Sequence, residues 1–260
     1  MNISDILLGA AIIIAAPAVN RVGEAKAQQI HPDQVVVDSP FVHDPVLAYE
    51  NGKYYLYSTG HGISQMTSAD RKHWTLCRDG VLKNHEIPAW THDSVPGFHT
   101  HIWAPDVIHY RNKWYLAYSC STFGKNTSAI GLLSNTSLAN VNGWKDEGCI
   151  LASEGKRDNW NAIDPNFVID DKGNPWMTWG SFWDGIQLVK LDKKTMHVKK
   201  GAKPQTIARR HAFGDASAEL NPTSKFAGTN AIEAPFIMKH GGYYYLFVSW
   251  DYCCRGIKSN

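Results

Sequence analysis

The sequence lacks long runs of charge and carries few cysteines. Its 26 Lys and Arg residues nearly balance 24 Asp and Glu residues, and no basic run exceeds a few residues. Nucleic acids bind to basic patches, so this balance argues against a nucleic-acid partner. The cysteines are odd in number and include no C-x-x-C pair, so neither a zinc site nor a disulfide framework is predicted. We expect them to pack as small apolar side chains; they are Cys77, Cys120, Cys149, Cys253 and Cys254.

Long hydrophobic runs are also lacking. The apolar stretch at residues 6–19 is too short for a comfortable membrane span, and Ala25-Lys26-Ala27 offers a small-x-small cleavage site. This pattern predicts a signal peptide over residues 1–27, a catalytic domain over residues 28–260, and a secreted or periplasmic protein with no further membrane contact. The segment before the apolar stretch has no Lys or Arg and carries Asp5, so an uncleaved anchor or a misplaced start site stays open.

No long helical period follows, and short runs rich in aromatic residues recur instead. Four segments each contain an acid and a proline, then a turn rich in Gly or Asn, then an aromatic run. Each segment predicts a β-hairpin; they are residues 43–58, 104–119, 163–181 and 232–249. Further strands are expected at residues 63–70, 73–77, 128–135, 143–151, 185–192 and 196–201.

Four strands repeated about every 60 residues are typical of the blades of a β-propeller. The sequence therefore predicts an all-β fold. Because the fourth repeat is followed by only a few residues, the pattern supplies about three and a half blades. We therefore expect a propeller truncated at its C-terminal end, with open sheet edges and little or no activity in this form.

Three acids lie at the start of their repeats, where the first strands of a propeller line its central channel: Asp44, Asp164 and Glu233. Glycoside hydrolysis needs one ionised and one protonated carboxyl group, and a third charge nearby helps to separate their pKa values. An acid beside a proline is also a common turn residue, but repetition at blade spacing favours catalysis. Asp106 follows its proline, so we expect its side chain to face differently and to be structural.

The motifs HDP (43–45), WAPD (103–106), NAIDP (161–165) and IEAP (232–235), in this order, resemble glycoside hydrolase family 43. The resemblance covers about residues 38–255 and is strongest to the endo-1,5-α-L-arabinanases of the family. It implies a five-bladed β-propeller and a reaction that inverts the anomeric centre. It also implies that Asp44 is the general base, that Glu233 is the general acid, and that Asp164 raises the pKa of the acid and orients it.

The same resemblance implies a cleft that binds arabinan or arabino-oligosaccharides, in a protein that we expect to be a monomer. For Trp103, Phe123 and Trp183, packing within the blades is the alternative. The expected substrate contacts are Asp44, Trp103, Phe123, Gly124, Asn161, Ala162, Ile163, Asp164, Ser181, Phe182 and Trp183.

Metal binding has weak support in the sequence. His99 and His101 alternate within FHTHIW, which predicts that they share one face of a strand. Two ligands without a third make a poor metal site, so we expect a polar cleft lining and no required cofactor. The resemblance implies an axial calcium ion, but its histidine ligand would come from a fifth blade that the repeat pattern lacks.

Two alternatives to an endo-acting arabinanase stay open. One is an exo-acting arabinofuranosidase or β-xylosidase of the same family, which the products from linear arabinan would distinguish. The other is a non-catalytic propeller that binds carbohydrate without turnover. Family 32 hydrolases also carry Asp-Pro-Asn, but near the start of their domain, whereas Asp164-Pro165-Asn166 lies midway here.

Overall fold

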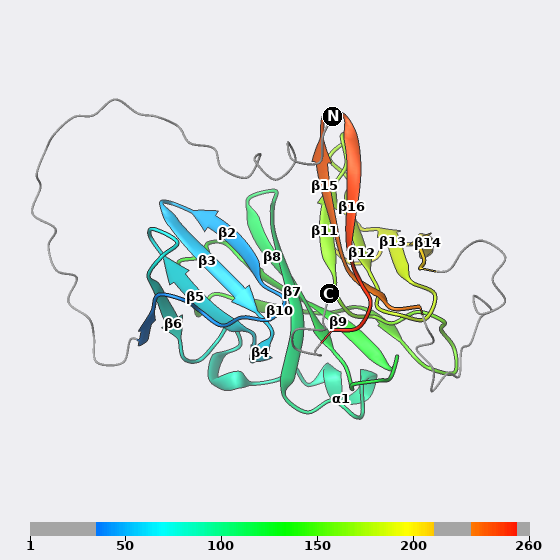
Figure 1. Cartoon of the computed structure of the whole chain (residues 1–260), viewed down its shortest axis with the longest axis horizontal. Coiled ribbons are helices and arrows are strands. Elements are labelled where there is room, and N and C mark those ends of the chain that lie inside the picture. The colour runs from blue at the N-terminus through cyan, green and yellow to red at the C-terminus, as the bar shows by residue number, and fades with distance from the viewer. Residues whose placement is uncertain (1–34, 211–229, 254–260) are drawn as a thin grey trace, which may run out of the picture. The chain divides into compact units, whose positions relative to one another are not determined.

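A computed structural model describes residues 35–210 and 230–253, and the predicted signal peptide lies outside these residues. Within them the chain forms four antiparallel sheets (Figure 1). The only helical elements in these ranges are the short helix α1 (Trp90–Ser94) and the 3₁₀ turn η2 (Lys83–His85). The predicted all-β fold is therefore confirmed. No helix in the described ranges is long and apolar enough to cross a membrane.

The first two sheets each contain five strands. The first sheet has the order β1 (Val35–Val37), β6 (Trp74–Cys77), β5 (Ser64–Ser68), β3 (Lys53–Ser58) and β2 (Val46–Glu50). The second has the order β10 (Lys145–Ser153), β9 (Ser128–Asn135), β8 (Lys113–Cys120), β7 (His101–Tyr110) and β4 (Gly60–His61). The two-residue strand β4 follows the first sheet in the chain but pairs with β7, so it ties the two sheets together.

The other two sheets are smaller. The third has the order β11 (Asn166–Ile169), β12 (Pro175–Trp179), β13 (Ile186–Lys190) and β14 (Gln205–Ala208). The fourth is the hairpin of β15 (Ile232–His240) and β16 (Tyr243–Trp250). All four predicted hairpins are thus present, and the strand count matches about three and a half blades in the described residues.

One expected strand is wrong. The segment 196–201 is a loop, and its only ladder contact is an isolated bridge between Leu191 and Val198. This bridge closes a tight loop in which Asp192 accepts backbone hydrogen bonds from Lys194 and Thr195. The chain then reaches the outer edge of the third sheet later than expected, as β14.

The hairpin turns follow from their sequences. In three of the four hairpins the turn has two residues, both with positive φ, which matches the twist of the flanking strands. Asn and Gly adopt this conformation most easily, and Arg takes the first position once. The pairs are Asn51 and Gly52, Arg111 and Asn112, and Gly241 and Gly242.

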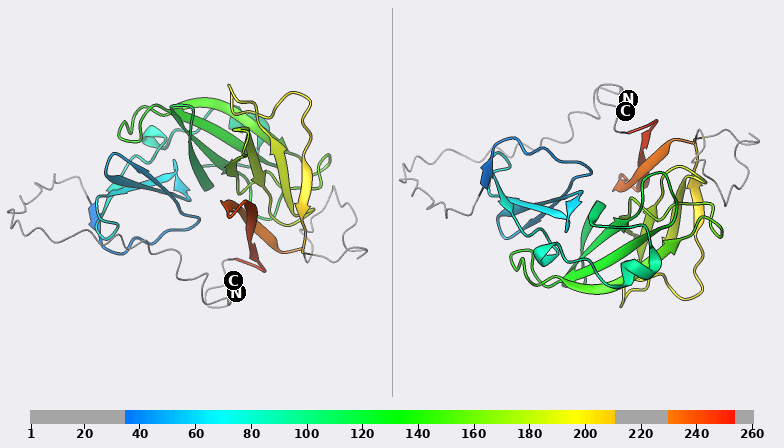
Figure 2. Two further views of the ribbon diagram at one scale, coloured as in Figure 1. Left: turned by 90° about the horizontal axis from the view of Figure 1, so that it is seen from above. Right: turned by 90° about the horizontal axis from the view of Figure 1, so that it is seen from below.

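The sheets contact each other in chain order through their first strands: β2 lies against β7, β7 against β11, and β11 against β15 (Figure 2). Apolar side chains fill the spaces between the first three sheets. Strand β8 is buried on both faces, because Leu116 and Tyr118 pack toward the first sheet and Tyr115 and Ala117 toward the third. This packing brings the first strands together and sets the position of their N-terminal residues.

Candidate active site

Four prolines lie within or directly before the first strands, at spacings of 60, 60 and 70 residues: Pro45, Pro105, Pro165 and Pro235. The residue before each proline has a left-handed backbone, with φ of 50° at Asp44, 41° at Ala104, 58° at Asp164 and 52° at Ala234. A positive φ is uncommon outside glycine, and a non-glycine residue that keeps it is held there by its surroundings. The repeated strain therefore marks these four positions as one structural feature of the fold.

The acid of the fourth sheet is placed differently from those of the first and third. Glu233 lies two residues before its proline, whereas Asp44 and Asp164 lie one residue before theirs. A break in register between Glu233 and Phe236 accompanies this shift. Such a bulge re-aims a side chain at the start of a strand. The longer side chain of Glu233 can thereby face the same region as the two aspartates.

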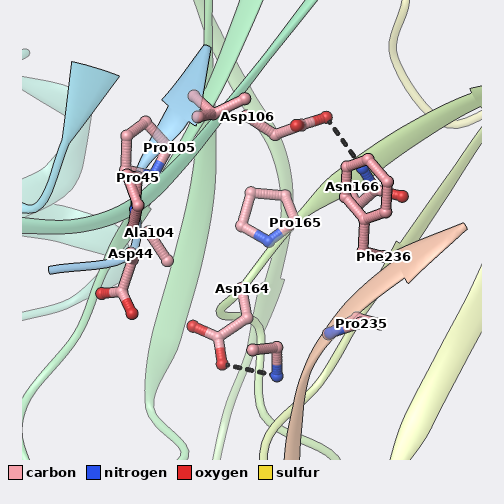
Figure 3. A pocket seen from close by; sticks show the side chains of 12 residues that line it. Asp44, Pro45, Ala104, Pro105, Asp106, Asp164, Pro165, Asn166, Pro235 and Phe236 are labelled. Carbon is pink, nitrogen blue, oxygen red and sulfur yellow. Dashed lines mark hydrogen bonds between the residues drawn. The ribbon is translucent and has the colours of Figure 1, made fainter. Parts of the chain in front are cut away.

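The prolines and their neighbours line a cavity of about 190 Å³ (Figure 3). Asp44 and Asp164 lie at one end of this cavity, and Asp106 and Asn166 lie at the other. Glu233 is not part of the lining, although its neighbour Ala234 is. The two ends therefore differ in character, with the predicted catalytic aspartates gathered at one end only.

Asp44 is held through one of its two carboxyl oxygens. Thr59 Oγ1 donates a hydrogen bond of 2.6 Å to Asp44 Oδ2, and His43 Nδ1 lies 2.7 Å from the same oxygen. Both contacts that the described residues make to this carboxyl group end on Oδ2. A water molecule that enters the site would therefore meet Oδ1.

Asp164 and Glu233 interact electrostatically and through the backbone. Asp164 Oδ2 accepts a hydrogen bond of 3.2 Å from the N–H of Ala234, the residue after Glu233. Burial raises the pKa of Asp164 well above its usual range, the negative charges of Glu233 and Asp44 raise it further, and the Ala234 bond opposes this. The carboxyl groups of Asp44 and Glu233 are thus close enough to Asp164 for their charges to act on it.

Glu233 also lies in an environment that favours its protonated form. Burial raises the pKa of Glu233, and the charge of Asp44 adds to this effect. A hydrogen bond of 2.9 Å from Ser181 Oγ to Glu233 Oε2 works in the opposite direction. A carboxyl group with a raised pKa suits the role of a proton donor near neutral pH.

Asp106 has the contacts of a structural residue. Its side chain is only 6% exposed, and Oδ2 accepts hydrogen bonds from Phe167 N at 2.7 Å and from Asn166 Nδ2 at 3.3 Å. Asn166 Oδ1 in turn accepts the N–H of Ile237 at 2.8 Å. These bonds join the second, third and fourth sheets. Burial raises the pKa of Asp106 to about 7, and the three N–H groups that bond to it limit this rise.

Several predicted substrate contacts are buried instead. The side chains of Ala162 and Ile163 lie in the interior, so their contact with a sugar stays a prediction that their side-chain burial does not favour. Asn161 is also buried, and its Oδ1 accepts a hydrogen bond of 2.6 Å from Ser128 Oγ, which joins two sheets. Trp183 is 8% exposed, as expected for the packing alternative. The local reason is that apolar side chains between adjacent sheets are needed to fill the core.

Among the other predicted substrate contacts, Ser181 is buried, whereas Gly124 and three aromatic residues remain accessible. Phe123 is 81% exposed, and Gly124 follows it with a left-handed φ of 74° in the loop after β8. Trp103 is half-buried at the start of β7. Phe182 is half-buried and packs against Tyr252, with ring centroids 5.4 Å apart. These aromatic side chains have exposed surface on which a sugar ring can stack.

The histidine pair is not arranged as expected. His99 precedes β7 and only His101 belongs to the strand, so the two residues do not share a strand face. His101 Nδ1 accepts a hydrogen bond of 3.1 Å from Trp103 Nε1, and its ring packs against His61. In the part of the chain that the structure describes, no three His, Cys, Asp or Glu side chains form a metal-binding cluster. The calcium ion that the resemblance implies therefore stays a prediction.

The cysteines differ in burial. Cys120 is buried, as expected for a small apolar side chain, whereas Cys77 and Cys149 are half-buried. Burial raises the pKa of Cys149 to about 11, which keeps this thiol protonated at neutral pH. Cys254 lies outside the described residues.

Comparison with known proteins agrees with this geometry. Residues 34–260 match the family described as Glycosyl hydrolases family 43. The chain belongs to this family. It is 42% identical over 217 residues to the extracellular exo-α-(1→5)-L-arabinofuranosidase ArbA of Cellvibrio japonicus, a match that covers 82% of this chain and 60% of the relative. It is 41% identical over 223 residues to the extracellular endo-α-(1→5)-L-arabinanase 1 of Bacillus subtilis, covering 84% of this chain and 62% of the relative.

The solved structures support the same family. An exo-1,5-α-L-arabinanase from a bovine ruminal metagenomic library is 53% identical, with a TM-score of 0.75, over 86% of this chain and 69% of that structure. The chain spans about three fifths of the length of the two curated relatives described above. The family and its fold are therefore established for the matched region, and relatives named as exo-acting and as endo-acting are both similar to the chain.

Sequence reasoning missed three polar residues around the acids: Thr59, Ser119 and Asn166. Thr59 and Ser119 each lie 14 residues after a proline of the repeat, and this spacing could have identified them. Each accepts a backbone N–H from the next sheet, Ala104 N at 2.9 Å and Asp164 N at 3.0 Å. The hydroxyl group at this position of the repeat thus joins the first sheet to the second through Thr59, and the second sheet to the third through Ser119.

Proposed function

We propose that the complete protein hydrolyses α-1,5-linked arabinan with inversion at the anomeric carbon. The observation that carries the proposal is the grouping of three acids, in which burial and the charges of Glu233 and Asp44 raise the pKa of Asp164, and burial and the charge of Asp44 raise the pKa of Glu233. The names of relatives from Cellvibrio japonicus and Bacillus subtilis, both of which act on α-(1→5)-linked arabinose, support the choice of substrate.

Asp44 is the proposed general base. Because Thr59 and His43 both contact Oδ2, Oδ1 is the oxygen that takes a proton from the attacking water. The water forms the new bond to the anomeric carbon as that proton moves to Asp44. An inverting enzyme keeps its base and acid about 6.5–9.5 Å apart, which leaves room for this water.

Glu233 is the proposed general acid. It gives its proton to the glycosidic oxygen as the bond to the anomeric carbon breaks, and the released sugar leaves with a hydroxyl group. The raised pKa of Glu233, caused mainly by burial, supports this role. Asp164 is proposed to orient Glu233 through the N–H of Ala234 and to couple its own ionisation to that of the acid.

We propose internal cleavage first, and exo action is the second candidate. The sequence identity of 53% to an exo-1,5-α-L-arabinanase favours exo action. The sequence identity of 41% to an endo-α-(1→5)-L-arabinanase supports internal cleavage. Incubation with linear arabinan, followed by chromatography at early times, separates them. Short oligomers as the first products support internal cleavage, whereas arabinose alone from the earliest time point contradicts it.

The same experiment tests whether the protein is an enzyme. Calorimetry with arabino-oligosaccharides, run beside the turnover assay, identifies a non-catalytic binding protein. Binding without any release of sugar would refute hydrolysis and support the carbohydrate-binding alternative. Release of sugar by the unaltered protein that disappears in the Glu233→Gln variant would support hydrolysis at this site.

Export is a further part of the proposal. The two curated relatives described above are extracellular, which supports secretion of this protein after removal of residues 1–27. N-terminal sequencing of protein recovered from the culture medium tests the cleavage site, with Gln28 expected as the first residue. Light scattering of the same sample tests the proposed monomer.

A further inference from the structure

Thr59 connects three parts of the site at once. It follows β3, and its backbone N–H donates to the carbonyl oxygen of His43 across 3.0 Å. Its hydroxyl donates to Asp44 Oδ2 across 2.6 Å and accepts the N–H of Ala104 across 2.9 Å. Thr59 is therefore hydrogen-bonded to the backbone of His43, to the side chain of Asp44, and to the backbone of the second sheet.

The direction of the bond to Asp44 follows from the Ala104 contact. A hydroxyl group has one proton to donate and lone pairs to accept with. The N–H of Ala104 can only donate, so it uses a lone pair of Thr59 Oγ1. The hydroxyl proton is then free to point at Asp44 Oδ2. Threonine is stiff at χ1, so its hydroxyl stays in this place at a smaller entropic cost than a longer side chain would have.

The equivalent residue of the second sheet shows what is particular to Thr59. Ser119 also lies 14 residues after its proline and also accepts an N–H from the next sheet, that of Asp164. Its sheet has Ala104 at the place before the proline, where the first sheet has Asp44. The hydroxyl at this place thus joins neighbouring sheets in both cases, and in the first sheet it also contacts a carboxyl group.

We propose that Thr59 is a positioning residue for the reaction, and that it fixes the Asp44 carboxyl group so that Oδ1 receives the proton of the attacking water. This inference rests on the proposed function of Asp44. Thr59 does not contact the reacting atoms in this account; it acts by holding Oδ2. Loss of its hydroxyl leaves His43 as the remaining contact to Asp44 Oδ2, so the carboxyl group is less firmly held, and it leaves the N–H of Ala104 without its acceptor.

Thr59→Val tests the inference because valine keeps the shape of threonine and removes both hydrogen bonds. We expect kcat on linear arabinan to fall roughly 10- to 100-fold with KM little changed, since misplacing a reacting group by about 1 Å costs about that much. Thr59→Ser keeps the hydroxyl and should restore most of kcat. If Thr59→Val does not fold, Thr59→Cys replaces it, with a weaker donor and an intermediate kcat expected.

Thr206→Val is the matched control. Thr206 Oγ1 donates to Asp184 Oδ2 across 2.6 Å, the same kind of bond at the same length, on the outer strand of the third sheet. Both valine variants should lower the melting temperature, but only Thr59→Val should lower kcat. The inference would be overturned if Thr59→Val had the same kcat as the unaltered protein. It would also be overturned if Thr59→Ser lost as much kcat as Thr59→Val.

A crystal structure of Thr59→Val separates this inference from the proposed function. We expect the Asp44 carboxyl group to leave its position or to occupy several conformers, while Asp164 and Glu233 stay in place. An Asp44 side chain that keeps its position without Thr59 Oγ1 would refute the inference even if the enzyme is active. If no arabinan is hydrolysed by the unaltered protein, the proposed function fails, and this structure still decides whether Thr59 fixes Asp44.

Discussion

Asp164 Oδ2 accepts the backbone N–H of Ala234 across 3.2 Å, so the carboxyl group of one sheet is bonded to the chain directly after Glu233 on the next. The bond holds the start of β15, whose left-handed Ala234 and register break aim Glu233 at the site. We therefore propose that Asp164 acts on Glu233 in two ways that can be separated experimentally, through this contact and through the coupling of its own ionisation to the charge of Glu233.

Asp164→Asn and Asp164→Ala separate the two effects. The Asn side chain can still accept the Ala234 N–H but cannot ionise, whereas Ala loses both properties. Because paired acids titrate together, removing one of them should move the alkaline limb of the kcat/KM profile to lower pH in both variants. Asp164→Ala should have the lower kcat of the two. Unchanged pH profiles in both variants would show that Asp164 and Glu233 are not coupled.

Asp44→Ala and Glu233→Ala should each lose most activity on arabinan. Removal of a general base or a general acid typically costs about 100- to 10,000-fold in rate. Initial rates with linear arabinan provide the measurement, and melting curves show that the variants are folded. Near-normal turnover by Glu233→Ala would contradict the assignment of the acid.

Asp106→Ala serves as the structural comparison for these two variants. Its side chain lies at the opposite end of the cavity and bonds to Phe167 and Asn166, so we expect lower stability but a retained rate per folded molecule. The cost should be about 1–3 kcal/mol, the range for a buried N–H that loses its partner. A loss of activity as large as that of Asp44→Ala would place Asp106 in the catalytic set.

Asp106→Asn should change how stability depends on pH. Burial raises the pKa of Asp106 to about 7, whereas an aspartate in the unfolded chain has a pKa of about 3.9. Its contribution to stability is therefore fully present below about pH 4 and is lost as pH rises through about 7. The Asn side chain can accept the same hydrogen bonds without ionising. The variant should thus melt at a higher temperature than the unaltered protein at pH 8, and at about the same temperature at pH 4.

Differential scanning calorimetry at both pH values tests this prediction. The matched comparison is Asp70→Asn, since Asp70 is exposed and its pKa is lowered mainly by the backbone N–H of His73. The Asp70→Asn variant should not melt at a higher temperature than the unaltered protein at pH 8. An equal melting temperature of Asp106→Asn and the unaltered protein at pH 8 would mean that Asp106 ionises at little cost in the folded state.

Much of the fold could be predicted because hairpins are local. Turn residues such as Asn51 and Gly52, between aromatic runs, are enough to predict β2 and β3, and the same pattern predicts β7, β8, β15 and β16. The outer strand β14 was misplaced because its position depends on the bridge between Leu191 and Val198, which pattern alone does not reveal. The helix α1 has only five residues, too few for a helical period to be visible.

The site was predictable only in part, for a similar reason. The order of acids and prolines along the chain indicated which carboxyl groups to consider. It did not indicate the left-handed backbone before each proline, because a residue in that place normally prefers an extended conformation. Nor did it indicate that Thr59 and Ser119 join adjacent sheets, because those contacts depend on how the sheets pack. The motif also did not indicate that the side chains of Ala162 and Ile163 face the core.

The anomeric configuration of the first product tests the account most directly. Asp44 acting as a base on water, with Glu233 as the acid, inverts the anomeric carbon of an α-linked arabinofuranose. Proton NMR, recorded as hydrolysis begins and before mutarotation, should therefore show β-arabinofuranose at the new reducing end. If the first product is the α-anomer, then Asp44 is not acting as a base on water, and the proposed mechanism is wrong.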